Sequence, residues 1–429
     1  MNQEDWRLDL RACSWAAIAG LLCGVVAVLF RLALANAEAA HQRLLAWVHT
    51  MPAGVWLLVP VLFGVGAGIA GWLVVRFVPE ASGSGIPHVE EILAGNEKMR
   101  WQRLLPVKFV GGILALGSGL SLGREGPTVQ MGAAIADAIA RANDAAVPLR
   151  HAILAAGAGA GLTAAFNAPL AGFVFVLEEL RRPLSVFTYT TGLIATLAAN
   201  VVMIAGLGPA PAFSVAKAAH MLPTGTLPLF ALIGIVTGLL GVVFNAALFA
   251  AIDGMARIPG PRWGRAVAAG VLAGVLALVV PAAISDGEPV AQAILHGELP
   301  VDPVRWLVVL LGAKLLLTVV SYASGAPGGL FAPLLVLGAA AGALVAHLLA
   351  VDPAVVTPLV IAGMVGAFTG SVRVPITGIV LLLEMTSSQH LVLELTTTGL
   401  VAYLVAALVG ARPVYDVLRE RDEARAHPV

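Results

Sequence analysis

Charge is the scarcest property of this chain. Only 12% of its 429 residues are charged, whereas about a quarter are charged in an average soluble domain. The formal net charge is zero, which gives no indication of a nucleic-acid partner. Its two cysteines, Cys13 and Cys23, lie in one apolar stretch, so neither a disulfide framework nor a metal site follows from them. No metal or other cofactor is expected.

Long apolar stretches take the place of charge. Hydrophobic residues make up 59% of the chain, and residues 55–75, 227–249 and 391–408 are almost free of charge. A bilayer core needs about 20 apolar residues for each helical span. The sequence therefore predicts an all-α integral membrane protein. Some apolar stretches are short or broken by glycine and proline, and their free backbone groups should face protein or a wet cavity.

The chain also contains an internal repeat. Displaced by 206 positions, it matches itself without a gap, mostly at glycine, proline and charged residues. The matched pairs include Lys108 with Lys314, Ser118 with Ser324, Gly123 with Gly329, Pro127 with Pro333, Gly132 with Gly338, Gly157 with Gly363, Pro169 with Pro375 and Glu178 with Glu384. Membrane proteins built from two such repeats are usually transporters that hold their substrate where the repeats meet.

The repeat sets the expected domain organisation. We expect one transmembrane domain over residues 1–421, with repeat one over about 54–206 and repeat two over about 226–410. A first span is expected over roughly 12–35, followed by a polar stretch with His41 and Arg43. A final short helix over about 413–421 and a cytoplasmic tail over 422–429 complete the chain.

Three glycine-rich turns each precede an expected helix with proline in its first turn. They are Gly83-Ser84-Gly85-Ile86-Pro87, Gly123-Arg124-Glu125-Gly126-Pro127 and Gly328-Gly329-Leu330-Phe331-Ala332-Pro333. Proline is tolerated there because the first N–H groups of a helix have no internal partner. The remaining free N–H groups and the positive end of the helix dipole favour an anion. Three such ends at one point would bind an anion strongly enough to admit it and weakly enough to release it.

Glu125 is the sharpest candidate in these turns. Its carboxylate can occupy an anion site, compete with a diffusible ion, and leave when protonated. Ionisable groups at membrane depth are functional by default, although a glutamate at this place can also cap its own helix. Its repeat partner, Phe331, cannot titrate, so the repeated backbone plan does not require a carboxylate here.

A second acidic candidate follows the repeat pair Glu178 and Glu384, which we interpret as structural. Glu179 matches Met385 instead of an acid, and is a candidate entry point for protons. A surface salt bridge between Glu179 and Arg182 is the alternative.

Three further kinds of polar residue stand near the turns. Ser84 and Tyr415 could complete the coordination of a small anion, although a lone tyrosine near a helix start is often an interfacial anchor. Lys108 and Lys314 could neutralise buried carboxylates such as Glu90 or set a positive potential.

With these motifs the chain resembles the CLC family of chloride channels and proton/chloride exchange transporters, of the bacterial type, over about residues 10–421. The resemblance implies about eighteen helices in two inverted-topology repeats, and a homodimer with one pathway in each subunit. It implies a central chloride bound by Ser84, with Gly85 and Ile86 of its turn, by Tyr415 and by the backbone N–H groups of Leu330 and Phe331. An outer site would use backbone N–H groups near Arg124 to Gly126.

The resemblance also assigns the two acids. Glu125 matches the gating glutamate of the family and Glu179 the internal proton glutamate of its exchangers. It therefore implies an exchanger of chloride and protons rather than a passive channel, which stays the alternative because the same filter serves both. Ser84 favours chloride over nitrate. His88 departs from the acidic residue often found there in bacterial relatives, and could change local pH sensitivity.

Orientation follows from basic clusters such as Lys98, Arg100 and Arg103, or Arg181 and Arg182. If these share a side, it is the cytoplasmic one, which places the protein in the inner (plasma) membrane with both termini in the cytoplasm. No enzymatic activity is expected. A distant rival is an intramembrane serine protease using Ser84 or Ser324 with His151 or His347, which would leave the repeat unexplained.

Overall fold

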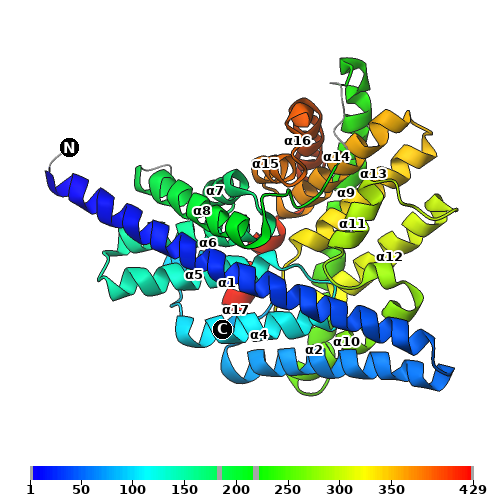
Figure 1. The fold of residues 1–429 in the computed structure, drawn as a ribbon, viewed down its shortest axis with the longest axis horizontal. Helices are drawn as coiled ribbons and strands as arrows, with labels where there is room; N and C mark the ends of the chain where they lie inside the picture. The colour runs from blue at the N-terminus through cyan, green and yellow to red at the C-terminus, as the bar shows by residue number, and fades with distance from the viewer. Residues whose placement is uncertain (1–2, 181–185, 216–221, 427–429) are drawn as a thin grey trace.

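The computed structural model describes residues 3–180, 186–215 and 222–426. These residues form seventeen α-helices, of which ten are long and apolar enough to cross a membrane (Figure 1). The all-α membrane architecture predicted from composition is therefore confirmed. Arg181 and Arg182 lie outside the described residues, and so does the salt bridge considered between Arg182 and Glu179.

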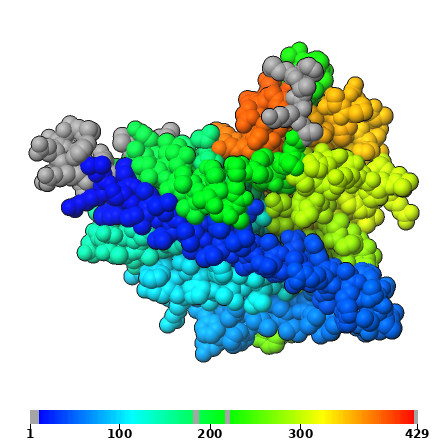
Figure 2. Space-filling model, viewed as in Figure 1, coloured from blue at the N-terminus to red at the C-terminus, as the bar shows by residue number. Residues whose placement is uncertain are grey.

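The first half of the chain supplies eight helices. They are α1 (Gln3–His49), α2 (Leu58–Phe77), α3 (Ile86–Ala94), α4 (Trp101–Gly117), α5 (Glu125–Ala142), α6 (Val147–Phe166), α7 (Pro169–Glu178) and α8 (Val186–Leu207). α1 lies across one face of the molecule in both views, packed on α8 and α6 (Figures 1 and 2).

The predicted end of the first span near residue 35 was wrong. α1 continues to His49 because its polar residues are accommodated inside the helical fold: Asn36 donates to the carbonyl of Leu32, and His41 is buried edge-on against Phe63.

The second half repeats this order of helices. It supplies α9 (Leu227–Arg257), α10 (Arg262–Val279), α11 (Glu288–Leu295), α12 (Pro303–Ala323), α13 (Phe331–Leu348), α14 (Pro353–Val372), α15 (Pro375–Thr386) and α16 (Val392–Leu408), and α17 (Val414–Ala426) ends the described chain. α17 runs five residues beyond the expected end at 421 and takes in most of the expected tail. It packs on α3 of the first half and α14 of the second, and so joins the two repeats.

The gapless offset of 206 residues holds only from α4 onward. Upstream of α4 and α12 the equivalent residues are 202 positions apart: the 3₁₀ turns Pro79–Ala81 and Pro281–Ala283 correspond, and so do Gly85 and Gly287, with φ angles of 80° and 81°. The difference of four residues lies mainly in α12, which has 21 residues against 17 in α4.

Elements of one half pack on their own counterparts in the other half. α2 packs on α10 and α7 packs on α15, as elements near a pseudo-twofold axis must. α7 and α15 are each capped by a glutamate of the other repeat. Glu178 accepts hydrogen bonds from the N–H groups of Ile376 and Thr377, while Glu384 accepts from those of Leu170 and Ala171. Each acid therefore caps the N-terminus of the other repeat's short helix, and the structural role expected for this pair is confirmed.

Removing one of these caps should destabilise the protein. Glu384→Ala leaves the N–H groups of Leu170 and Ala171 without their acceptor, which should lower the free energy of unfolding by about 1–3 kcal/mol. The thermal unfolding of purified variants checks this, with Glu384→Gln, which keeps one acceptor oxygen, expected to lie between Glu384→Ala and the unsubstituted protein. Glu298→Ala, at an exposed carboxylate, is the control and should unfold like the unsubstituted protein. Equal stability of Glu384→Ala would contradict the capping role.

Candidate anion pathway

The three glycine-rich turns meet at the junction of the repeats. The N–H of Gly123 donates to the carbonyl of Gly329 and the N–H of Gly329 donates back to that of Gly123, at 2.8 and 2.7 Å. The turn at Gly83 joins them, since its N–H donates to the carbonyl of Ala326 and its carbonyl accepts from Gly328. These bonds fix the starts of α3, α5 and α13 around one point, with backbone N–H groups as the natural donors for an anion.

The Glu125 side chain lies at this meeting point. It is fully buried, and its Oε1 accepts a 2.7 Å hydrogen bond from the N–H of Phe331, the first residue of α13. Its Oε2 has no hydrogen-bond partner in the described part of the chain. A Cβ at either Gly123 or Gly329 would overlap this carboxylate, so both glycines are needed for its approach. The Glu125 carboxylate thus occupies the N–H group that the start of α13 would otherwise offer to an anion.

Two buried hydroxyl groups lie near the meeting point of the turns, on Ser84 and Tyr415. Ser84 is fully buried and its Oγ accepts from the N–H of Ile86. Tyr415 is also buried, with its ring centroid 6.0 Å from that of Phe331. The Tyr415 hydroxyl makes no full hydrogen bond within the described residues, although it is close enough to Ser84 to interact with it. A buried hydroxyl group with an open donor position can bind an anion.

Neighbouring groups approach the backbone at Gly126 and Gly85 so closely that neither position has room for a side chain. A Cβ on Gly126 would collide with the main chain of Ser84, and one on Gly85 would overlap the side chain of Gln130. Gln130 also contacts His88, with its Nε2 2.9 Å from the His88 Nδ1. The other ring nitrogen of His88, Nε2, lies 3.1 Å from a carboxylate oxygen of Glu97. His88 therefore belongs to a polar network directly behind the Ser84 turn.

The repeat-paired lysines donate hydrogen bonds to backbone carbonyls of the turns. Lys108 donates to the carbonyls of Ala81 and Gly83. Lys314 donates in the same way to Ala283, Ile284 and Ser285 of the equivalent turn. The carboxylate of Glu90, which sequence reasoning offered as a partner of a lysine, lies 3.9 Å from Arg419 instead.

Glu179 lies at a polar cavity away from the turns. The side chain is buried at the C-terminal end of α7. It lines a cavity of about 170 Å³ together with Glu90, Leu93, Ala94, Leu180, Asp416 and Arg419. This volume has room for several water molecules. The cavity lies between the C-terminal end of α3 and α17, whereas Glu125 lies at the N-terminal end of α5.

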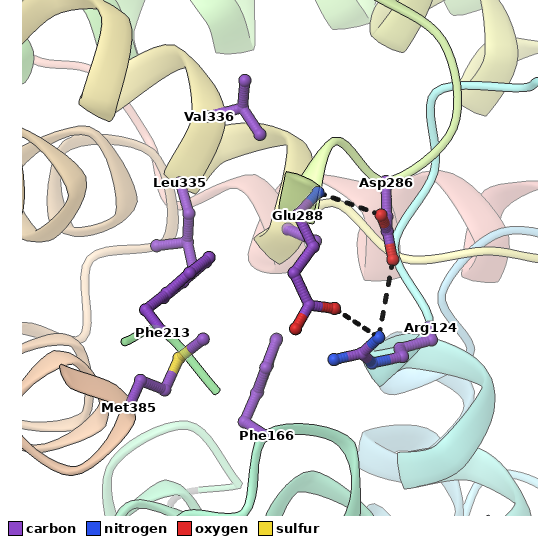
Figure 3. Close-up of a pocket in the computed structure, with 9 residues that line it drawn as sticks. Arg124, Phe166, Phe213, Asp286, Glu288, Leu335, Val336 and Met385 are labelled. Atoms are coloured by element: carbon purple, nitrogen blue, oxygen red, sulfur yellow. Dashed lines mark hydrogen bonds and ion pairs between the residues drawn. The ribbon is translucent and has the colours of Figure 1, made fainter. Parts of the chain in front are cut away.

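Arg124 lies at a second and much smaller cavity, of about 10 Å³, which is the space one water molecule needs. Its Nη1 is 2.6 Å from an oxygen of Glu288 and 3.7 Å from one of Asp286, and its Nε donates to the carbonyl of Ala165. Figure 3 shows the Glu288 carboxylate turned toward this guanidinium, facing a wall of apolar side chains. That wall consists of Phe166, Phe213, Ala332, Leu335, Val336 and Met385.

Sequence reasoning missed several residues of this region. Tyr322 places its hydroxyl 3.4 Å from the N–H of Ser84, yet its counterpart at the 206-residue offset is Leu116, so the repeat carried no signal. Asp286 and Glu288 had a signal that the single offset concealed, because Ser285-Asp286-Gly287-Glu288-Pro289 matches Gly83-Ser84-Gly85-Ile86-Pro87 at 202 positions.

Comparison with known proteins decides the family. The family described as voltage gated chloride channel matches residues 66–407, more than half of the chain. This chain belongs to the CLC family. The resemblance inferred from the three turns is therefore confirmed.

Individual CLC proteins are similar over nearly the whole chain. The H(+)/Cl(-) exchange transporter ClcA of Yersinia pseudotuberculosis is 37% identical over 96% of this chain and 87% of its own. The protein of the same name from Vibrio campbellii is 38% identical over 95% and 88%. Among solved structures, a slow cyanobacterial Cl-/H+ antiporter is 33% identical with a TM-score of 0.91, covering 96% of this chain and 98% of its own. A CLC-type fluoride/proton antiporter shares the fold alone, at 22% identity and a TM-score of 0.80.

Proposed function

We propose that this protein is a proton-coupled chloride exchange transporter, in which chloride passes the meeting point of the three turns. The observation that carries the proposal is the buried Glu125 carboxylate accepting from the N–H of Phe331. An anion that competes for this place must displace the carboxylate, and a protonated glutamic acid leaves it more readily than a charged one. Displacement by chloride and uptake of a proton are thereby linked at one side chain.

The anion is held in this proposal by groups with open donor capacity. Ser84 and Tyr415 offer hydroxyl groups, and Leu330 and Phe331 offer N–H groups at the start of α13, that of Phe331 once the Glu125 carboxylate has left it. An outer position is proposed at the start of α5, at the N–H groups near Arg124 to Gly126. Gly85 and Ile86 belong to the Ser84 turn at the central position. These are dipoles and not full charges, which suits an ion that must also leave.

Protons are proposed to reach Glu125 from the outside and to enter from the cytoplasmic side by way of Glu179. Glu179 is buried but borders a cavity large enough for water, lined by further carboxylates and Arg419. A buried acid beside hydrated carboxylates can take a proton from water and release it inward. On the cytoplasmic side, chloride and protons thus use separate entrances and meet at Glu125.

The cellular setting is also a proposal. Exchangers of this family named in the comparisons are transporters and not enzymes, and we propose transport without enzymatic activity. The basic residues Lys98, Arg100 and Arg103 favour a cytoplasmic side for that surface. The proposed location is the inner membrane with both termini in the cytoplasm, and the proposed assembly is a homodimer with one pathway in each subunit, as the family resemblance implies.

Exchange and passive conduction predict different behaviour of the unsubstituted protein. In proteoliposomes with an imposed chloride gradient and no initial pH gradient, an exchanger should drive protons across the membrane and so create a pH gradient, recorded simultaneously with chloride. A passive channel would dissipate the chloride gradient without any proton movement beyond that of protein-free vesicles, and that result would overturn the proposal. For the protease alternative, Ser324 Oγ donates to the carbonyl of Ser321 and His347 Nδ1 lies 2.8 Å from the carbonyl of Ala343, so these hydrogen bonds of the two residues go to the backbone.

A further inference from the structure

The structure contains a fourth turn built like the one at Ser84. Gly83 and Gly85 have φ angles of 59° and 80°, and Ser285 and Gly287, their equivalents, have 55° and 81°. Ser84 Oγ accepts from the N–H two residues later, and Asp286 Oδ1 does the same with the N–H of Glu288, at 3.1 Å. The supporting lysines, Lys108 and Lys314, are equivalent as well.

The inverted repeat puts these two turns on opposite sides of the membrane midplane. The Ser84 turn carries a neutral hydroxyl, whereas the fourth turn carries the carboxylates of Asp286 and Glu288. Asp286 caps α11, and its other oxygen is 3.7 Å from Arg124. The Glu288 carboxylate is not needed as a cap and contacts the guanidinium directly at 2.6 Å.

The contact between Glu288 and Arg124 lies beside the meeting point of the turns, where chloride is proposed to pass. Arg124 directly precedes Glu125, and Ala332, which follows the N–H donor Phe331, lines the same small cavity as Glu288. A chloride ion is larger than a water molecule, so it cannot pass a space of about 10 Å³ unless a lining group moves. The aromatic and aliphatic wall is buried, while the Glu288 side chain is about a quarter exposed at 27% and can withdraw.

We propose that Glu288 is a positioning residue that closes the Arg124 end of the pathway by holding the guanidinium. This inference rests on the proposed function, because it assumes that chloride uses this end. The carboxylate both narrows the opening and cancels the positive charge that would attract an anion. Arg31 and Glu38 of α1 also interact electrostatically with Arg124, Asp286 and Glu288, and Lys314 interacts with Asp286.

Neutralising Glu288 should therefore ease the entry of chloride. In proteoliposomes with equal chloride on both sides, isotopic chloride exchange by Glu288→Gln should show an apparent KM about fivefold lower, the size expected for one unit charge acting across a few ångströms of partly screened medium. The maximal rate should change less than KM, because no group at the meeting point is altered. Glu288→Asp keeps the charge but withdraws it by one methylene group, and should give a smaller shift. Glu298→Gln, an exposed acid shortly after α11, is the matched control and should behave like the unsubstituted protein.

A double-mutant cycle separates this role from a merely structural one. If Glu288 acts through Arg124, the effect of Glu288→Gln on KM should disappear in an Arg124→Gln background. An unchanged KM in folded Glu288→Gln, or an equal shift with and without Arg124, overturns the inference. If Glu288→Gln does not fold, Glu288→Asp decides, and an unchanged KM there overturns it as well. Passive chloride flux without protons in the unsubstituted protein would refute the exchanger and still leave the KM comparison measurable.

Discussion

Protein with Glu125→Gln, reconstituted in liposomes, is expected to carry chloride without moving protons. The carboxylate of Glu125 is the only group at the meeting point that both accepts from the Phe331 N–H and can be protonated, among the described contacts of that N–H. An amide can occupy the same place but cannot take up a proton. Proton flux driven by a chloride gradient should fall by about 100-fold or more, the contribution that a positioned proton-transfer group typically makes.

The size of the chloride flux distinguishes two substitutions at this position. Glu125→Gln keeps a side chain in the place of the anion, whereas Glu125→Ala empties it, so chloride should pass faster with alanine than with glutamine. A chloride electrode and a pH electrode in one chamber record both ions together. Glu125→Ala that still pumps protons against a chloride gradient would refute the mechanism.

Glu179→Gln is expected to abolish proton movement while chloride still crosses. Glu179 is buried beside the cavity of about 170 Å³, whereas the Phe331 N–H donates to Glu125. Removing its titratable proton should interrupt the proton route and leave the anion site at the meeting point of the turns intact. Proton flux should again fall by about 100-fold or more, and chloride flux should keep the same order of magnitude.

The neighbouring residue supplies a closely matched control. Glu178 differs from Glu179 by one position, but its carboxylate caps α15 through the N–H groups of Ile376 and Thr377. Glu178→Gln should therefore lower thermal stability and preserve the ratio of protons to chloride in the molecules that remain folded. Normal proton pumping by Glu179→Gln, or loss of coupling in Glu178→Gln alone, would contradict this division of roles.

Local backbone chemistry is the part of this protein that can be predicted from sequence. Glycine at positive φ and proline in a first helical turn act within a few residues, so the helix starts near Ile86, Glu125 and Phe331 were accessible. Pairing by the repeat extended this reasoning to a structural role of Glu178 and Glu384, but not to the helix that each acid caps. It failed where the halves differ in length, and the turn at Asp286 and Glu288 was not seen for that reason.

Contacts between distant segments were not accessible in the same way. The Tyr322 hydroxyl reaches Ser84 across 238 positions, and Glu288 reaches Arg124 from the other repeat. Nothing in the neighbours of these residues along the chain specifies such a partner. The length of α1 was also missed, because a polar stretch ends a helix in one setting and is buried in another, as His41 is here.

The sequence alone determined a duplicated helical membrane protein with three helix starts suited to an anion and one acid among them, because composition, glycine and proline act locally. Only the tertiary structure decided which donor the Glu125 carboxylate meets, that Glu179 borders a cavity large enough for water, and that Glu288 contacts Arg124. Those outcomes depend on how two inverted halves pack against each other, and side-chain partners separated by a hundred or more residues are selected by that packing.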